Sequence, residues 1–239
     1  MLIGVGRLQQ YVVVHHMSDT FRLPRVGTVD EPLRLAVLIS GSGSGMEALL
    51  RHQAATRLAG GCCHQTTVVI SNVADVKGLA RAIEHDTPAE VIVLPAGDNS
   101  SERRVAHEQA IHVRLCELGI EAVILSGYMR ILTNDFVRKW QGRLLNIHPS
   151  LLPDFPGAHA HRDVLEAGVD TTGCTVHFVD MGVDSGTIIA QRAVPVEPED
   201  DENSLSERVK QVEHRLYPMV IDAFCEGRLQ ISNGQVEIA

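Results

Sequence analysis

An amide and an imidazole stand two residues apart within residues 142–157, GRLLNIHPSLLPDFPG. Apolar neighbours make this stretch typical of a buried strand, and side chains two apart on a strand point to one face, so Asn146 and His148 aim the same way. Prolines from Pro149 onward end the strand and stiffen the loop behind it. A donating amide beside a titratable ring suits holding an oxyanion and moving a proton, the two tasks of acyl transfer. The alternative is a buried polar pair that only satisfies nearby backbone.

A second feature that can do chemistry is the glycine-rich loop at residues 40–45, SGSGSG, between an apolar strand and the start of a helix. Unpaired amides and the positive end of a helix dipole make such a junction an anion site. No Gly-Lys-Ser/Thr closes the loop, and Met46 stands where GxGxxG has its third glycine. The next strand ends in Ser71-Asn72 without the acidic residue of a dinucleotide fold. The loop therefore predicts a site for a single phosphate, and a tight turn without a ligand is the alternative.

Two carboxylates follow a strand-like run at residues 174–179, in the loop sequence DMGVDSG. Either Asp180 or Asp184 could reach across to an imidazole. A carboxylate beside His148 would stabilise the imidazolium and raise the pKa of the ring, which makes it a usable acid near neutral pH. An aspartate in a glycine-containing loop also forms turns without any catalytic role.

The side chains and the glycine-rich loop described above must be positioned by strands and helices, which alternate along the chain. We expect strands at 35–39, 67–70, 91–94, 122–125, 144–148, 174–179 and 187–190, and helices at 76–84, 101–118 and 162–167. The pattern predicts an α/β fold: a Rossmann-like, mainly parallel twisted sheet with helices on both faces. Ligands of such sheets collect at the carboxyl ends of the strands. The glycine loop, residues 126–130 and the Asn146/His148 pair all fall at that edge.

A further helix is predicted to begin at Ser204, where Ser204 and Glu207 have the spacing of a capping box. Apolar residues then recur every three or four positions, and Glu213 lies beside that stripe, where it could face inward. We interpret His177 and His214 as packing or surface residues. Near the end of the chain, residues 233–234 are an Asn-Gly pair that predicts a hairpin.

The composition of the chain disfavours nucleic-acid partners and a place in a membrane. The chain has 239 residues, 44% hydrophobic and 21% charged, and a formal net charge of -9. Without clustered basic residues a nucleic-acid partner is not expected, and no apolar run is long enough for a membrane span. Five cysteines without CxxC spacing fit a reducing, cytosolic location, and the Cys62-Cys63-His64 run is interpreted as structural rather than as a metal site. Small-molecule substrates are the expected partners.

The domain organisation that we expect is simple. Residues 1–33 carry no clean period and are predicted to form a poorly ordered extension with no function that the sequence indicates. Residues 34–239 are predicted to form a single domain, since a chain of this length can bury one sizeable core. Monomer and homodimer both remain open.

Several motifs together resemble a known family. They are LNIHPSLLP at 145–153, DMGVDSG at 180–186, GSGSG at 41–45, GYMRIL at 127–132 and VEHRLYP at 212–218. In order and spacing, from about residue 35 to about residue 229, they resemble the formyltransferases that use 10-formyltetrahydrofolate, and in particular the branch that formylates glycinamide ribonucleotide in purine synthesis. That resemblance implies an enzyme of one-carbon transfer with 10-formyltetrahydrofolate as co-substrate and no metal.

The resemblance also implies residue roles. Asn146, His148 and Asp184 would be the catalytic set. Gly43, Ser44 and Gly45 would hold the phosphate of glycinamide ribonucleotide, and Glu213 would receive its amino group. Folate contacts would come from Arg104, Met129, Arg130, Ile131, Leu132 and Asn146. The implied domain carries its phosphate site in the N-terminal half and its folate site in the C-terminal half.

One position departs from the family pattern. The glycine loop of the family usually continues with Asn and Leu, whereas this chain has Gly45 and Met46. Backbone amides survive such a change, but a contact through the asparagine side chain does not. Phosphate binding is thereby a weaker inference than the catalytic set.

Three other functions compete. A related formyltransferase could act on an aminoacyl-tRNA or an amino sugar, and a related hydrolase would release the formyl group to water. We expect the tRNA enzyme to carry a basic C-terminal domain and the hydrolase a regulatory domain. A sugar-phosphate binding protein without chemistry would need only the glycine loop, and it would leave Asn146, His148 and Asp184 without a role.

Overall fold

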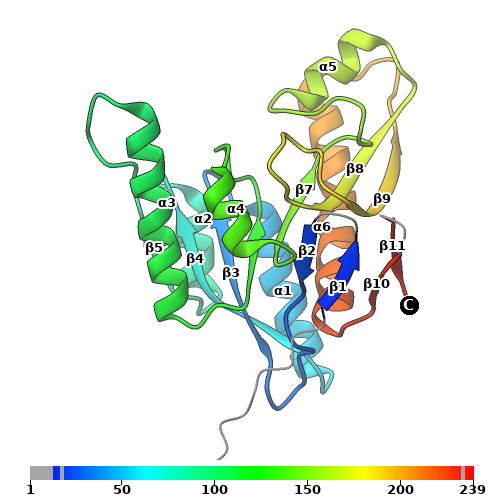
Figure 1. The fold of residues 1–239 in the computed structure, drawn as a ribbon. Coiled ribbons are helices and arrows are strands. Elements are labelled where there is room, and N and C mark those ends of the chain that lie inside the picture. Colours follow the sequence, from blue (N-terminus) through cyan, green and yellow to red (C-terminus); the bar gives the residue numbers. More distant parts are fainter. Residues whose placement is uncertain (1–12, 17–18, 233–234) are drawn as a thin grey trace, which may run out of the picture.

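A seven-stranded sheet forms the centre of the computed structural model, which describes residues 13–16, 19–232 and 235–239 (Figure 1). Its strands are β3 (Leu33–Ile39), β4 (His64–Ser71), β5 (Ala89–Val91), β6 (Ala122–Leu125), β7 (Leu144–His148), β8 (Thr171–Phe178) and β9 (Ile188–Pro195). Their spatial order is β5-β4-β3-β6-β7-β8-β9. The first five pair in parallel, and β8 runs antiparallel to both β7 and β9. The predicted mainly parallel α/β sheet is confirmed.

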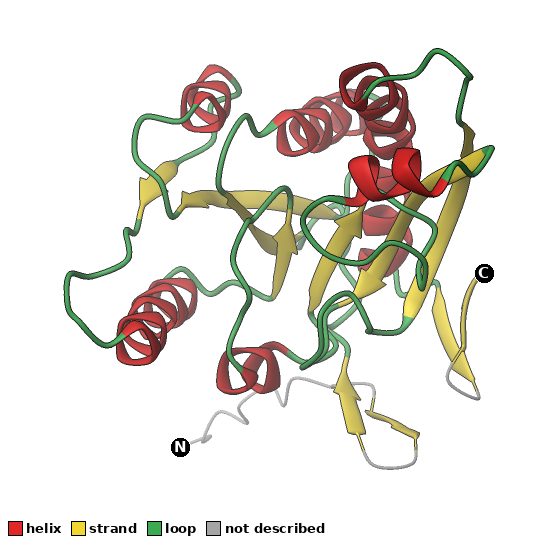
Figure 2. Ribbon diagram, turned by 90° about the horizontal axis from the view of Figure 1, so that it is seen from above, coloured by secondary structure: helices red, strands yellow, loops and turns green. Residues whose placement is uncertain are grey.

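Helices cover both faces of this sheet (Figure 2). One apolar core joins the sheet to α1 (Ser44–Leu58), α2 (Lys77–Glu84), α5 (Ala160–Ala167) and α6 (Glu202–Cys225). The other joins it to α3 (Ser100–Glu117) and α4 (Asn134–Trp140). Strand β3 serves both: Leu35 and Val37 pack in the first core, and Ala36 and Leu38 in the second. A strand between two helical layers needs apolar residues on both faces, which is why its sequence is continuously apolar from Leu35 to Ile39.

The chain reverses its direction of travel across the sheet between β3 and β6. From β3 it passes through α1 to β4 and through α2 to β5, and then α3 carries it back to β6 on the other side of β3. In open parallel sheets this reversal is where ligands bind, because the loops after the two strands diverge there. The glycine-rich loop follows β3 and residues 126–130 follow β6, so both candidate segments flank the reversal.

Two helices, α4 and α6, differ from the sequence prediction. Helix α4 was not predicted; it is a short helix whose N-cap, Thr133, accepts a hydrogen bond from the amide of Phe136. Helix α6 begins at Glu202, earlier than expected, and its capping box joins Asp201 to Ser204. The predicted box between Ser204 and Glu207 is wrong, because Ser204 serves as the third helical residue rather than as the cap.

The segment before β3 contains strands β1 (Val13–His16) and β2 (Asp19–Arg22), which pair antiparallel. Residues 1–12 and 17–18 of the expected extension lie outside the described residues. Further on, Arg25 forms an ion pair with Glu121 at 2.8 Å, and the amide of Gly27 donates to the carbonyl of Cys225 at 2.8 Å. Residues before the boundary expected at residue 33 therefore bond to residues of the predicted domain.

At the other end, strands β10 (Leu229–Ser232) and β11 (Gln235–Ile238) pair antiparallel, with Ser232 opposite Gln235. The Asn-Gly turn predicted between them, at 233–234, lies outside the described residues.

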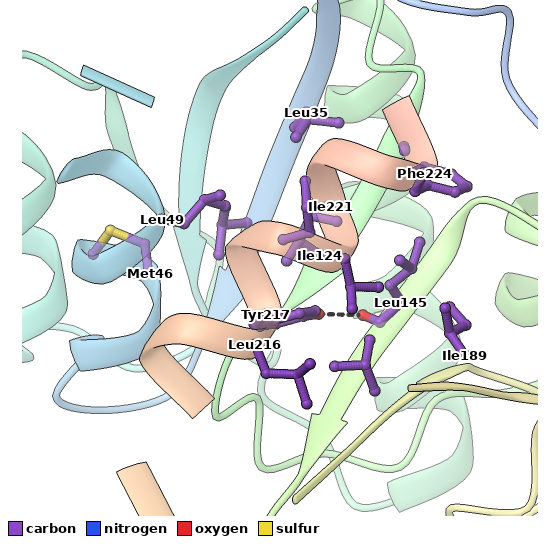
Figure 3. Close-up of a cluster of buried hydrophobic side chains, with 14 of the residues drawn as sticks. Leu35, Met46, Leu49, Ile124, Leu145, Ile189, Leu216, Tyr217, Ile221 and Phe224 are labelled. Carbon is purple, nitrogen blue, oxygen red and sulfur yellow. Dashed lines mark hydrogen bonds between the residues drawn. The ribbon is translucent and has the colours of Figure 1, made fainter. Parts of the chain in front are cut away.

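Tyr217 ties α6 to the centre of the sheet (Figure 3). Its buried hydroxyl lies 3.0 Å from the carbonyl oxygens of both Leu125 and Leu145. These are the residues directly before Ser126 and Asn146, so one side chain of α6 fixes the positions at which β6 and β7 deliver their polar groups.

Candidate active site

Two cavities lie along the carboxyl ends of the strands. The first has a volume of about 430 Å³ and is lined by the segment after β6, by Asn146 and His148 of β7, and by residues of the loop between β8 and β9. The second, of about 310 Å³, is lined by the glycine-rich loop, Ser126, His161 and Glu213, among others. Gly127, Met129, Ile147 and Pro149 line both. Because they share this wall, a molecule in one cavity can contact a molecule in the other.

His148 is buried, and both of its ring nitrogens face oxygen acceptors. Nε2 lies 2.8 Å from the carbonyl oxygen of Phe155, and Nδ1 lies 3.3 Å from Oδ2 of Asp184. A ring that donates at both nitrogens is the imidazolium form, so this geometry suits a group that has a proton to give. Asp184 is held in turn by the amide of Gly157, which donates to Oδ2 at 2.8 Å.

Of the two candidate carboxylates, the structure brings Asp184 to the ring. Asp180 also borders the first cavity, but it accepts hydrogen bonds from the Ser185 hydroxyl and the Gly182 amide and so closes its own loop. The strand and loop pattern left the choice open because both residues follow the same strand, whereas the family resemblance implied Asp184, the residue that the fold of the loop brings to the ring.

Asn146 lies against His177, a residue that the sequence assigned to packing or the surface. The amide Nδ2 of Asn146 is 3.2 Å from Nε2 of His177, whose Nδ1 donates to the carbonyl of Phe178 at 2.9 Å. An amide nitrogen can only donate, so Nε2 of His177 accepts from Asn146, and burial of the ring lowers the pKa of His177. His177 is buried, as the packing interpretation expects, and it also borders the first cavity and contacts the Asn146 amide.

The glycine-rich loop ends in Gly43, which caps α1 in the left-handed conformation with φ 65°. A Cβ there would come within 2.8 Å of the Cα of Gly78, so the turn needs glycine for its conformation and for space. No side chain in the described part of the chain caps α1 at this residue. The amides of its first turn, including those of Ser44 and Gly45, are therefore free to bind an anion in the second cavity.

Glu213 projects from α6 into the second cavity, as the sequence allowed. Burial raises the pKa of its carboxyl group to about 7, although the nearby charge of Lys210 acts in the opposite direction. A carboxyl group poised near neutrality can bind an amino group as a carboxylate and can also exchange a proton with it.

Residues 33–221 match the formyl transferase family. The chain belongs to that family. It is 39% identical over 201 residues to phosphoribosylglycinamide formyltransferase of Escherichia coli (strain K12), which covers 83% of this chain and 90% of that protein. The crystal structure of glycinamide ribonucleotide transformylase 1 from Symbiobacterium toebii superimposes with a TM-score of 0.80 at 42% identity, covering 87% of this chain and 94% of the other.

Longer relatives match as well. The chain is 46% identical over 204 residues to the human trifunctional purine biosynthetic protein adenosine-3, covering 85% of this chain but only 19% of that protein. The formyl transferase therefore corresponds to one part of such a protein. The resemblance inferred from the motifs is confirmed at the level of the family.

In this formyl transferase the segment expected to contact folate lines the first cavity: Met129, Arg130, Ile131 and Leu132 all border it. The side chains of Met129 and Ile131 are 70% and 63% exposed. Arg104 lies on α3 and borders neither cavity.

Of two histidines that the sequence did not single out as functional, His161 lines the second cavity, and His214 contacts Ser44, a residue that lines it. Nδ1 of His161 is buried and has no partner among the described residues, and burial lowers the pKa of this ring. Nε2 of His214 lies 3.3 Å from the Ser44 hydroxyl. A histidine gives no periodic signal of its own, so only their tertiary positions distinguish them.

Within residues 13–16, 19–232 and 235–239, no group of three or more His, Cys, Asp or Glu side chains is arranged to hold a metal ion. In the same part of the formyl transferase, every helix is too short or too polar to cross a bilayer.

Proposed function

We propose that this chain transfers the formyl group of 10-formyltetrahydrofolate to the amino group of glycinamide ribonucleotide, giving formylglycinamide ribonucleotide and tetrahydrofolate in de novo purine biosynthesis. The names of its relatives and its membership of the formyl transferase family support this proposal. The observation that carries it is the grouping of Asn146, His148 and Asp184 beside Ile147 and Pro149, the residues where the two cavities meet.

The folate donor is assigned to the first cavity. A volume of about 430 Å³ suits a ligand of moderate size. The exposed apolar side chains of Met129 and Ile131 offer surface to flat rings, and Arg130 adds a positive charge. Arg104 is not needed for this assignment.

Glycinamide ribonucleotide is assigned to the second cavity. The free amides at the start of α1, at Ser44 and Gly45, would hold its phosphate. The carboxyl group of Glu213, which lines the same cavity, would receive its amino group. This arrangement directs the amine toward the wall that the two cavities share.

The reaction requires the amine nitrogen to attack the formyl carbon. The new C–N bond makes the carbonyl oxygen an oxyanion, to which Asn146 donates a hydrogen bond. The bond between the formyl carbon and N10 of the folate then breaks, its electron pair stays on N10, and His148 supplies the proton that N10 takes up. The proton lost by the new amide nitrogen restores the imidazolium. Donors of this kind contribute about 3 to 4 kcal/mol each to transition-state stabilisation.

Two further residues support that chemistry. Asp184 lies 3.3 Å from Nδ1 of His148 and keeps the ring charged and oriented. His177 accepts a hydrogen bond from one N–H of the Asn146 amide, which leaves the second N–H of the same amide for the oxyanion.

All five cysteines are free thiols, which supports a cytosolic location for the enzyme.

The test is a spectroscopic assay of formyl transfer from 10-formyltetrahydrofolate, first with glycinamide ribonucleotide and then with water alone as acceptor. We expect tetrahydrofolate to form at a substantial rate only when glycinamide ribonucleotide is present. Equal rates with water alone would indicate a hydrolase, and the proposed acceptor would be wrong.

A further inference from the structure

Ser126 occupies the first position after β6, at the point where the chain reverses across the sheet. Its side chain is 7% exposed and borders the second cavity but not the first. The backbone is fixed on both sides: the amide of Ser126 donates to the carbonyl of Leu38 at 3.0 Å, and Tyr217 binds the carbonyl of Leu125. The hydroxyl is thus delivered to the second cavity by a rigid strand end.

Ser126 and Gly45 are neighbours in the lining of that cavity. A Cβ added to Gly45 would lie 2.7 Å from Oγ of Ser126, and no other atom outside its own helix and chain neighbours comes within 4 Å. Gly45 is not in the left-handed region, so its backbone would accept other residues. One hydroxyl group therefore decides whether position 45 can carry a side chain.

The Ser126 hydroxyl has no hydrogen-bond partner among the described residues, unlike other serines near the strand ends. Ser71, at the end of β4, donates to the carbonyl of Val73, and Ser40, after β3, accepts from the amide of Met129. A serine hydroxyl offers one donor and two acceptor sites, and at Ser126 these sites border the second cavity. A ligand oxygen in the second cavity would satisfy the hydroxyl.

We propose that Ser126 is a substrate-binding residue of the second cavity, whose hydroxyl donates to a phosphate oxygen and replaces the contact that a polar side chain at position 45 would make. This inference rests on the proposed function, because it assumes a phosphorylated substrate. The proposal explains why the glycine loop differs from the family pattern. Where the family has the polar side chain of Asn in the first turn of α1, this chain has Gly45, and the hydroxyl of Ser126 directly after β6 supplies the polar group.

The experiment compares three variants with the wild type: Ser126→Ala, Gly45→Asn and the double variant. Ser126→Ala should raise KM for glycinamide ribonucleotide about ten-fold, the effect of one hydrogen bond to a charged group, with kcat and KM for the folate changed less than about two-fold. Gly45→Asn should bind the nucleotide still more weakly, because the added side chain meets the Ser126 hydroxyl. The double variant should recover KM to within about three-fold of the wild type, because the hydroxyl at 2.7 Å is gone and an amide replaces it.

Ser71→Ala is the matched control, since Ser71 is buried at a strand end but borders neither cavity. It should lower the melting temperature and leave both KM values unchanged. An unchanged KM for the nucleotide in Ser126→Ala would overturn the proposal. So would a double variant no better than Gly45→Asn alone.

The proposed function and this inference can fail separately. If the wild type does not formylate glycinamide ribonucleotide, the proposed function is wrong, and inorganic phosphate then serves as the probe. Calorimetric titration should still give about ten-fold weaker phosphate binding to Ser126→Ala than to the wild type. Equal affinities, or no binding by either protein, would overturn the role of Ser126.

Discussion

The first cavity presents side chains that hold one another, whereas the second presents backbone amides and side chains that lack partners. In the first, Asp184 fixes His148 and His177 fixes Asn146. In the second, Nδ1 of His161 is buried without a hydrogen-bond partner among the described residues. A group already bonded in the empty protein is preorganised for a transition state, while an unpaired group gains its partner when substrate arrives.

This contrast predicts a division of kinetic effects. Changes in the first cavity should lower kcat, because its groups act on charge that appears only during the reaction. Changes in the second should raise KM for the nucleotide, because its groups contact a phosphate and an amine that are present from the start.

The largest effect is expected for Asp184→Asn. An amide in place of the carboxylate no longer favours the imidazolium of His148, and kcat should fall by about a hundred- to ten-thousand-fold with both KM values little changed. Asp180→Asn is the matched control, since Asp180 lies in the same loop but bonds only within it, and it should reduce kcat less than about ten-fold. Steady-state kinetics measure both. Similar losses in the two variants would mean that loop structure, not the charge beside His148, is what matters.

Asn146→Asp should come next. The two side chains have nearly the same shape, but a carboxylate would stand against the developing oxyanion, and kcat should fall by about a hundred- to a thousand-fold. Wild-type turnover in this variant would remove Asn146 from the proposed mechanism.

Glu213→Gln tests the second cavity, where KM rather than kcat should change. Burial raises the pKa of Glu213 to about 7, so the carboxylate that attracts the amino group forms as the pH rises through neutrality. KM for the nucleotide should fall over that range in the wild type. In Glu213→Gln it should be about ten-fold higher and should lack this pH dependence. The amine of the substrate titrates equally in both proteins, so the difference between the two profiles isolates Glu213.

The raised pKa of Glu213 also makes the free energy of unfolding depend on pH. The pKa of Glu213 in the folded protein, about 7, lies above the ordinary glutamate value of 4.5. Its contribution to the free energy of unfolding is therefore complete below about pH 4.5 and is lost as the pH rises through about 7. Urea unfolding at about pH 5 and about pH 8 should show a smaller loss of stability for Glu213→Gln than for the wild type. Equal losses would contradict the burial of this carboxyl group.

The smallest effect is expected at Tyr217, which lines only the second cavity but bonds the ends of two strands, β6 and β7. Tyr217→Phe removes the hydroxyl that bonds the carbonyls before Ser126 and Asn146, which should cost about 1 to 3 kcal/mol of unfolding free energy and lower kcat a few-fold. Tyr128→Phe is the matched control, because the Tyr128 hydroxyl is buried without a partner among the described residues. Its removal should leave stability unchanged or raise it. Equal losses in the two variants would remove the special role of Tyr217.

Much of this arrangement could be predicted because it rests on local patterns. The continuous apolar run of β3 indicated a strand between two helical layers. The period of two in β7 indicated that Asn146 and His148 share a face, and the glycines before α1 indicated an open helix N-terminus. Each of these signals depends on residues within a few positions of one another, and backbone sterics translate them directly into structure.

What the tertiary structure alone decided is pairing between distant segments. The antiparallel register of β7 and β8 places Asn146 opposite His177, and the path of the loop after β8 brings Asp184 rather than Asp180 to His148. The contact between Gly45 and Ser126 likewise joins α1 to the end of β6. No local period records such contacts, because they arise from the register and packing of the whole sheet. The residue types showed which chemistry was available, and the fold selected the side chains that meet to perform it.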